Sequence, residues 1–361
     1  MPSRNANARQ DDLPFMQQLG DAFVSHQSNQ FLLTGNVLDL LRCPWEKSQS
    51  DDARPYLTLS DYLCHRLTVR DRLVITYNIA RGIEFASPED KQRAAAIYLG
   101  LFSAKDMKEG RRSFDETVAN SPAYVLASLT LLRKICKAAA LAPSGPPVAI
   151  IIEYADSVVP NNAITQMGDH DRQRLIFLKE WLTDSGFVDS SNLLIMIAET
   201  SSSVHGSIRS LPHVVSINLP LPDLHERRLF IRWLVRQYPD LKLKGSQTSF
   251  AQLSAGMSLL GIEQTMRLAR YKKGKLEASD FLYYLNRLLV NHIGDYIEII
   301  KPAHTLKDVI GATTLKRQLK RVSQAMQASD PSVSPVGLLV AGPNGVGKTF
   351  IFTAWAGETD R

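Results

Sequence analysis

One eight-residue motif near the carboxyl end of the sequence restricts the fold more than any other feature. Residues Gly342-Pro343-Asn344-Gly345-Val346-Gly347-Lys348-Thr349 fit the pattern G-x-x-x-x-G-K-[ST]. The apolar stretch 336–341 before the motif is typical of a buried strand, and residues 350–357 after it can form a helix. A strand, a glycine-rich loop and a helix in this order form a phosphate-binding loop, in which backbone N–H groups and the positive helix end face a phosphate.

These residues predict a site for ATP and Mg²⁺. Residues 342–347 would surround the phosphates, Lys348 would reach the β- and γ-phosphate oxygens, and the Thr349 hydroxyl would take a position on Mg²⁺. Lys348 and Thr349 are therefore the candidate catalytic residues, and Thr349 is the candidate metal contact. The motif lies twelve residues before the end of the 361-residue sequence, and no base or sensor follows it. We therefore expect these 361 residues alone to be inactive in hydrolysis.

The composition is that of a folded protein. Hydrophobic residues make up 44% and charged residues 22%, with a net charge of +6, and the length suggests two or three domains. The densest basic cluster, Lys316-Arg317 with Lys320-Arg321, has helical i, i+4 spacing, which favours a solvated helix face over a nucleic-acid site.

The sequence also predicts a cytoplasmic protein that does not enter a membrane. The three cysteines are far apart and have no histidines at metal-ligand spacing, as expected for reduced thiols. The polar N-terminus lacks the apolar core of a signal peptide, and no apolar run approaches the ~18 residues that span a bilayer. Asp169-His170-Asp171 could ligate a metal, but three adjacent residues converge poorly on one ion, which favours a solvated turn.

Apolar strands alternate with helices over the first 220 residues. Strands are predicted at 31–36, 73–77, Val148–Ile152, Asn192–Ala198 and 214–218, and helices at 57–67, 122–141 and 171–183. This alternation predicts an α/β fold with a doubly wound parallel sheet and helices on both faces. Val148–Ile152 and Asn192–Ala198 are apolar throughout, so we expect them to be neighbouring central strands that are covered on both sides.

Strand signals disappear after residue 222. Helical periodicity at 226–236, 249–255, 261–271 and 278–289 predicts a small all-α domain. A new unit begins near Pro302, with a helix at 312–328 before the phosphate-binding loop.

The last sixty residues resemble the opening of an AAA-family (AAA+) ATPase module. The resemblance rests on the linker Thr305-Leu306-Lys307-Asp308-Val309-Ile310-Gly311, the following helix with Leu315-Lys316, and Gly337–Pro343 before the loop. In that family the linker lies against the adenine. The resemblance therefore implies Asp308, Val309 and Ile310 as contacts of the base.

Residues 30–290 resemble a degenerate copy of the same module. Gly35-Asn36 falls where a phosphate-binding loop would follow the first strand, but Gly-Lys-Thr is absent. Glu153-Tyr154-Ala155-Asp156 stands where the family has Asp-Glu-x-Asp (Walker B), which implies that Glu153 and Asp156 are its remnants; a structural role for both is the alternative. Thr200 is at the sensor position and Arg209 near the arginine-finger position, although Arg209 equally fits a surface arginine. An unrelated doubly wound domain remains the alternative for this region.

The resemblance implies a tandem AAA protein with a P-loop-NTPase-like α/β fold. Its parts would be a flexible tail (1–12), a degenerate α/β domain (13–222), a helical lid (223–300) and the start of a second module (301–361). We expect ATP hydrolysis in the second module to remodel an unknown macromolecular partner, in a homo-oligomeric, hexameric ring. The alternative is a non-catalytic adaptor or ring scaffold with vestigial nucleotide binding.

Overall fold

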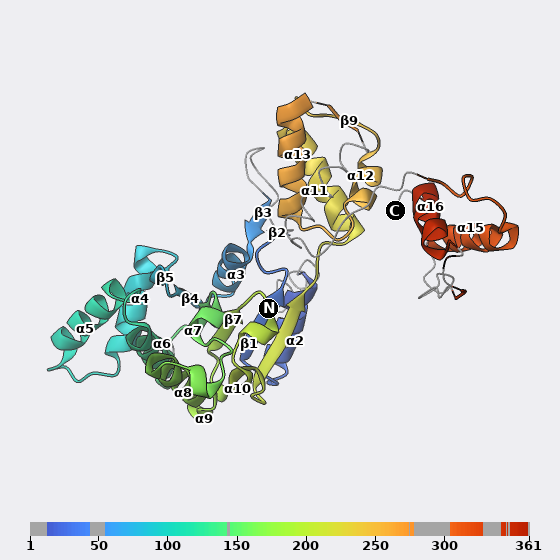
Figure 1. Ribbon diagram of the computed structural model, residues 1–361. Coiled ribbons are helices and arrows are strands. Elements are labelled where there is room, and N and C mark those ends of the chain that lie inside the picture. Colours follow the sequence, from blue (N-terminus) through green and yellow to red (C-terminus); the bar gives the residue numbers. More distant parts are fainter. Residues whose placement is uncertain are drawn as a thin grey trace. The chain divides into compact units, whose positions relative to one another are not determined.

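The computed structural model describes residues 13–43, 55–142, 145–273, 275–277, 304–327, 341–343, 345 and 347–359. The chain forms two compact units, Met1–Phe281 and Leu282–Arg361 (Figure 1). The expected tail (1–12), the helix at 278–289 and residues 336–340 of the strand expected at 336–341 lie outside the described residues. The expected boundary at 300/301 also lies outside them and stays a prediction.

The first unit is built on a six-stranded sheet with the order β5-β4-β6-β7-β1-β8. All neighbouring strands are parallel except β5, which forms an antiparallel hairpin with β4. The fold is therefore the predicted α/β, P-loop-NTPase-like class. The strands are β1 (Gln30–Gly35), β4 (Leu73–Asn78), β5 (Gly82–Phe85), β6 (Val148–Ile152), β7 (Leu193–Ile197) and β8 (Val214–Leu219).

The two fully apolar strands β6 and β7 are neighbours at the centre of the sheet, as predicted. Alternate side chains point to opposite faces, so Ile150 and Leu194 belong to one apolar cluster and Ile151 and Ile195 to another. Every residue of both strands is buried. Uninterrupted apolar character was thus a reliable signal, because both faces of these strands are covered by helices.

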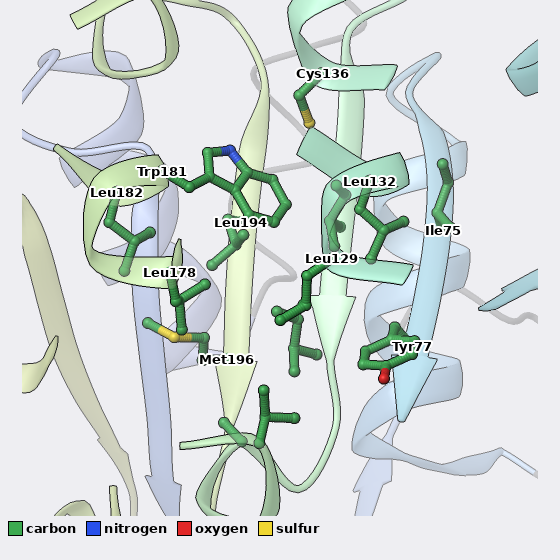
Figure 2. Close-up of a cluster of buried hydrophobic side chains, with 14 of the residues drawn as sticks. Ile75, Tyr77, Leu129, Leu132, Cys136, Leu178, Trp181, Leu182, Leu194 and Met196 are labelled. Atoms are coloured by element: carbon green, nitrogen blue, oxygen red, sulfur yellow. The ribbon is translucent and has the colours of Figure 1, made fainter. Parts of the chain in front are cut away.

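The larger cluster lies under α6 and α8 and includes Trp181, which is 1% exposed. Figure 2 shows Trp181 and Leu182 beside Leu194 of β7, and Leu132 beside Ile75 of β4. The opposite face is covered by α2 and α3. The helices and 3₁₀ turns are α2 (Pro14–Val24), α3 (Leu59–Thr68), α4 (Pro88–Leu99), α5 (Met107–Ala119), α6 (Val125–Leu141), α7 (Ala155–Val158), η1 (Ile164–Gln166), α8 (Asp169–Leu182), α9 (Ser185–Val188), η2 (Ser201–Ser203) and α10 (Gly206–Arg209).

The helical region after residue 222 contains three of the four predicted helices among the described residues, and one feature that the sequence did not predict. Its helices are α11 (Leu224–Gln237), α12 (Gln247–Leu253) and α13 (Leu259–Lys273). A short parallel pair, β9 (Lys242–Lys244) with β10 (Lys275–Glu277), joins them, so the region is not all-α. Each strand has three residues and only Leu276 is fully buried, which is too little pattern for a sequence signal.

The second unit is described mainly by two helices, α15 (Thr313–Gln327) and α16 (Lys348–Thr359), which match the predicted helices at 312–328 and 350–357. Among the residues that the structure describes, every helix is too short or too polar to cross a membrane.

Candidate nucleotide-binding site

The glycine-rich motif of the second unit forms a turn that leads directly into a helix. Gly345 and Gly347 both have φ of +83°, a backbone conformation that glycine adopts without steric cost. Helix α16 then begins at Lys348, so its positive end adjoins the turn. Asn344 and Val346, the other motif residues between Pro343 and Lys348, lie outside the described residues.

Lys348 folds back over the turn. Its Nζ donates hydrogen bonds of 2.6 Å to the carbonyl oxygens of Gly342 and Pro343. These bonds hold the ammonium group over the turn, and Thr349, the next residue of α16, is exposed. A cation and an exposed hydroxyl therefore stand on the first two residues of a helix N-terminus, which is the chemistry that binds phosphate and a divalent ion.

The linker before α15 packs against the helix that follows the motif. Leu306 and Val309 are buried in a cluster with Leu319 of α15 and with Ile351 and Ala354 of α16. This cluster packs the linker against α15 and α16, and its contact with a base stays a prediction.

The three linker residues differ in what they offer a ligand. Ile310 is 99% exposed, whereas the Val309 side chain is turned into the cluster. Asp308 accepts a 2.7 Å hydrogen bond from the backbone N–H of Thr305, which lowers the pKa of its carboxyl. The resemblance implies all three as contacts of the base, but only Ile310 has an apolar side chain that is exposed. The ring of His304, a residue without a predicted role, lies 5.2 Å from the ring of Phe350 in the first turn of α16.

The first unit carries a cavity at the place where a doubly wound sheet binds its ligands. The connection after β1 crosses one face of the sheet through α3, and the connection after β7 crosses the other through α10. Ligands bind at the carboxyl ends of strands where the winding reverses. A cavity of about 640 Å³ lies there, lined by residues that include Val37, Cys64, Asn78, Arg81, Glu153 and Glu199.

Glu153 is the central polar group of this cavity, and it is 9% exposed. Its Oε2 accepts a hydrogen bond of 2.6 Å from Asn78 Nδ2 and pairs with Arg81. Burial raises the pKa of the Glu153 carboxyl, but hydrogen bonds from Ser60, Asn78 and Arg81 outweigh burial and hold the pKa below its ordinary value. Sequence reasoning missed Asn78 and Arg81, which sit at the turn of the β4–β5 hairpin.

The two neighbours of Glu153 in the degenerate motif do not join this network. Tyr154 is 52% exposed and has φ of +52° and ψ of +51°, a left-handed conformation that costs a bulky residue on the order of 1–3 kcal/mol. Asp156 is half-buried on α7 and is not among the residues that line the cavity in the described structure. Glu153 and Asp156, which were selected together, therefore do not share this cavity.

The loop after β1 differs from a phosphate-binding loop in its hydrogen bonds. The backbone N–H groups of Gly35 and Asn36 donate to the carbonyls of Glu199 and Leu219, both at 2.9 Å, and that of Val37 donates to Gly35 at 2.7 Å. The chain then continues as a strand rather than as a helix. That strand, β2 (Leu40–Arg42), pairs with β3 (Tyr56–Thr58).

The remaining candidate residues of the first unit are not among those that line the cavity. Arg209 is exposed at the end of α10, and among the residues that the structure describes it forms no ion pair. Thr200 is exposed and accepts a 3.3 Å hydrogen bond from the Ser202 hydroxyl. Asp169 and Asp171 each pair with an arginine three residues later, Arg172 and Arg174.

Comparison with known proteins identifies the family. No curated protein sequence matches the chain. A chain in the structure described as the E. coli MS115-1 HORMA:CdnC:Trip13 complex is similar at 13% identity with a TM-score of 0.43, over 79% of this chain and 82% of that one. The profile of the family described as "AAA+ chaperone, N-terminal Rossmann-like domain" matches residues 9–220, more than half of the sequence. The chain therefore belongs to this family of AAA+ chaperones.

Proposed function

We propose that this chain is part of an AAA+ ATPase that binds Mg²⁺·ATP at residues 342–349 and uses its hydrolysis to remodel a macromolecular partner. The observation that carries the proposal is the glycine turn before α16, over which Lys348 is held by the Gly342 and Pro343 carbonyls. A lysine in this position can transfer its hydrogen bonds to β- and γ-phosphate oxygens. Thr349 would supply the hydroxyl for Mg²⁺, and the linker with Ile310 would flank the base.

The first unit would serve as a structural module in a tandem arrangement. Its loop amides at Gly35, Asn36 and Val37 already have carbonyl partners, and no lysine directly follows them. Phosphate oxygens in this place would therefore lose charge-assisted hydrogen bonds, which contribute roughly 1.5–3 kcal/mol each. Glu153 would hold the β4–β5 hairpin through Asn78 and Arg81 rather than activate water.

Assembly into a ring, with a hexamer as the expected form, completes the proposal. Arg209 is exposed on α10 and could reach a nucleotide on a neighbouring copy as an arginine finger, a role that adds transition-state stabilisation in phosphoryl transfer. In a protein that carries a complete second module, Arg209→Ala should lose assembly-dependent turnover and keep its nucleotide affinity. An unchanged turnover would remove Arg209 from the mechanism.

Equilibrium binding of a fluorescent ATP analogue tests the nucleotide site. We expect Lys348→Ala to weaken binding by roughly ten- to a hundredfold, because one charge-assisted contact is lost. Lys307→Ala is the matched control, since it removes an exposed lysine from the neighbouring linker and should leave affinity unchanged. Equal affinity of wild type and Lys348→Ala would contradict the proposal and favour a non-catalytic scaffold.

A further inference from the structure

Asp39 makes an unusual long-range contact between the two parts of the first unit. It lies in the loop after β1, directly before β2, and is 3% exposed. Its Oδ2 accepts a hydrogen bond of 2.8 Å from the backbone N–H of Leu259, and its Oδ1 accepts one of 2.9 Å from the backbone N–H of Leu260. Asn36 Nδ2 donates to the same carboxylate at 2.9 Å. Asp39 thus caps helix α13 from 220 residues away in sequence.

The N-terminus of α13 has a local cap as well. The Ser258 hydroxyl accepts 3.1 Å from the N–H of Gly261, so three of the four unpaired N–H groups that begin every helix are satisfied by side chains. The first two are the ones that Asp39 takes. A helix N-terminus favours an anion, and a bidentate carboxylate presents two oxygens to it much as a phosphate does.

A second contact joins the same two regions. Tyr56 of β3 is 4% exposed, and its ring lies 4.7 Å from that of Phe230 and 5.2 Å from that of Trp233, both on α11. Burial raises the pKa of Tyr56 to about 12. The β2–β3 hairpin therefore packs against α11 in the part of the chain where a helix would follow a phosphate-binding loop.

We propose that the Asp39 carboxylate takes the place of a nucleotide phosphate and holds residues 224–277 against the sheet without any nucleotide. The loop after the first strand is the place where P-loop folds bind phosphate. Here the loop amides are hydrogen-bonded to carbonyl oxygens. The same loop instead supplies the Asp39 carboxylate to the N-terminus of α13. The inference rests on the proposed structural role of the first unit, and it adds that this unit is held closed at all nucleotide concentrations.

Hydrogen–deuterium exchange on the full chain tests this idea. Every protein in the test carries Lys348→Ala, which weakens the proposed nucleotide site of the second unit. Asp39→Ala should speed amide exchange at Leu259 and Leu260 by roughly tenfold. It should also speed exchange in strand β3 (Tyr56–Thr58), the Tyr56 segment. Asp39→Asn keeps one acceptor oxygen and should give a smaller increase, which keeps the test available if the alanine variant folds poorly.

Asp223→Ala is the matched control. Asp223 caps α11 by accepting 2.8 Å from the Glu226 N–H, but this cap is local and exposed. It should raise exchange only in the first turn of α11 and leave α13 and the Tyr56 segment unchanged. If Asp39→Ala and Asp223→Ala have equally local effects, Asp39 is an ordinary helix cap and the proposal is wrong.

Two ligand additions complete the experiment. Mg²⁺·ATP should not change exchange at Leu259 and Leu260 when Asp39 is present, whereas inorganic sulfate should restore their protection saturably in Asp39→Ala. A response to ATP with Asp39 intact, or no recovery with sulfate, would overturn the proposal. Failure of ATP to bind at Lys348 would contradict the proposed function alone, because every arm lacks that lysine.

Discussion

Gly35 occupies a position where a side chain would meet fixed atoms. Its φ is +89°, and an added Cβ would lie 2.5 Å from the Leu219 carbonyl oxygen, which is backbone in β8. At the residue scale we expect Gly35→Ala to lower the free energy of unfolding by about 3 kcal/mol or more, from the left-handed backbone plus the clash. Urea denaturation measures this loss.

Substitutions at two other glycines separate the cost of the left-handed backbone from the cost of the clash with β8. Gly256 has φ of +81° with no atom near the added Cβ, so Gly256→Ala should cost only the backbone part, about 1–2 kcal/mol. Gly20 lies within helix α2 in open space, and Gly20→Ala should stabilise by about 0.5–1 kcal/mol. Equal losses at Gly35 and Gly256 would show that the clash with β8 is relieved.

Also at the residue scale, Glu153 should make the free energy of unfolding depend on pH. Its folded pKa lies below the ordinary value of 4.5, so its charged form stabilises the fold above pH 4.5, and this contribution is lost as pH falls through the lower folded value. At pH 7, Glu153→Gln should be less stable by roughly 1–3 kcal/mol. The gap from wild type should narrow below about pH 4.5, as measured by urea midpoints at each pH.

Glu84→Gln is the control for Glu153. Glu84 also pairs with Arg81, at 3.3 Å, but its side chain is 43% exposed. Solvent screening should keep its effect below about 1 kcal/mol at every pH. A Glu153 gap that is constant from pH 7 to pH 3 would contradict the assigned hydrogen bonds.

At the scale of elements, Asn192, the residue directly before β7, joins that strand to β6 and α6. It is 2% exposed, its Oδ1 accepts 2.9 Å from Val148 N–H at the start of β6, and its Nδ2 donates 2.8 Å to the Cys136 carbonyl in α6. Asn192→Ala leaves the Val148 N–H buried without this acceptor and removes the bond to α6, so it should destabilise by roughly 1–3 kcal/mol in urea denaturation. Asn161→Ala removes an exposed 2.8 Å bond to Ser202 and should cost less than about 1 kcal/mol; equal losses would argue against this junction.

The elements of the first unit show which parts of the fold could be predicted from the sequence and which could not. β6 and β7 were predicted with their neighbour relation because continuous apolar character requires cover on both faces. The β2–β3 hairpin was not predicted, because its three-residue strands carry no periodicity. The functional residues differ in the same respect. Lys348 belongs to a local motif that can be read from the sequence, whereas the contact of Asp39 with α13 depends on residues that only the fold brings together.

At the scale of the whole molecule, the two compact units should respond differently to nucleotide. Mg²⁺·ATP stabilises only the unit that binds it, by about 2.7 kcal/mol at a hundred times Kd. In differential scanning calorimetry of the intact chain, we expect ATP to raise the Tm of the transition that contains residues 282–361 and to leave that of residues 1–281 unchanged. At the same ATP concentration, Lys348→Ala should reduce the shift to about half or less, and Lys307→Ala should retain it. A nucleotide-dependent shift of the first unit in the Lys348→Ala protein would place a nucleotide at the Gly35 loop, despite its occupied amides, and would refute its structural role.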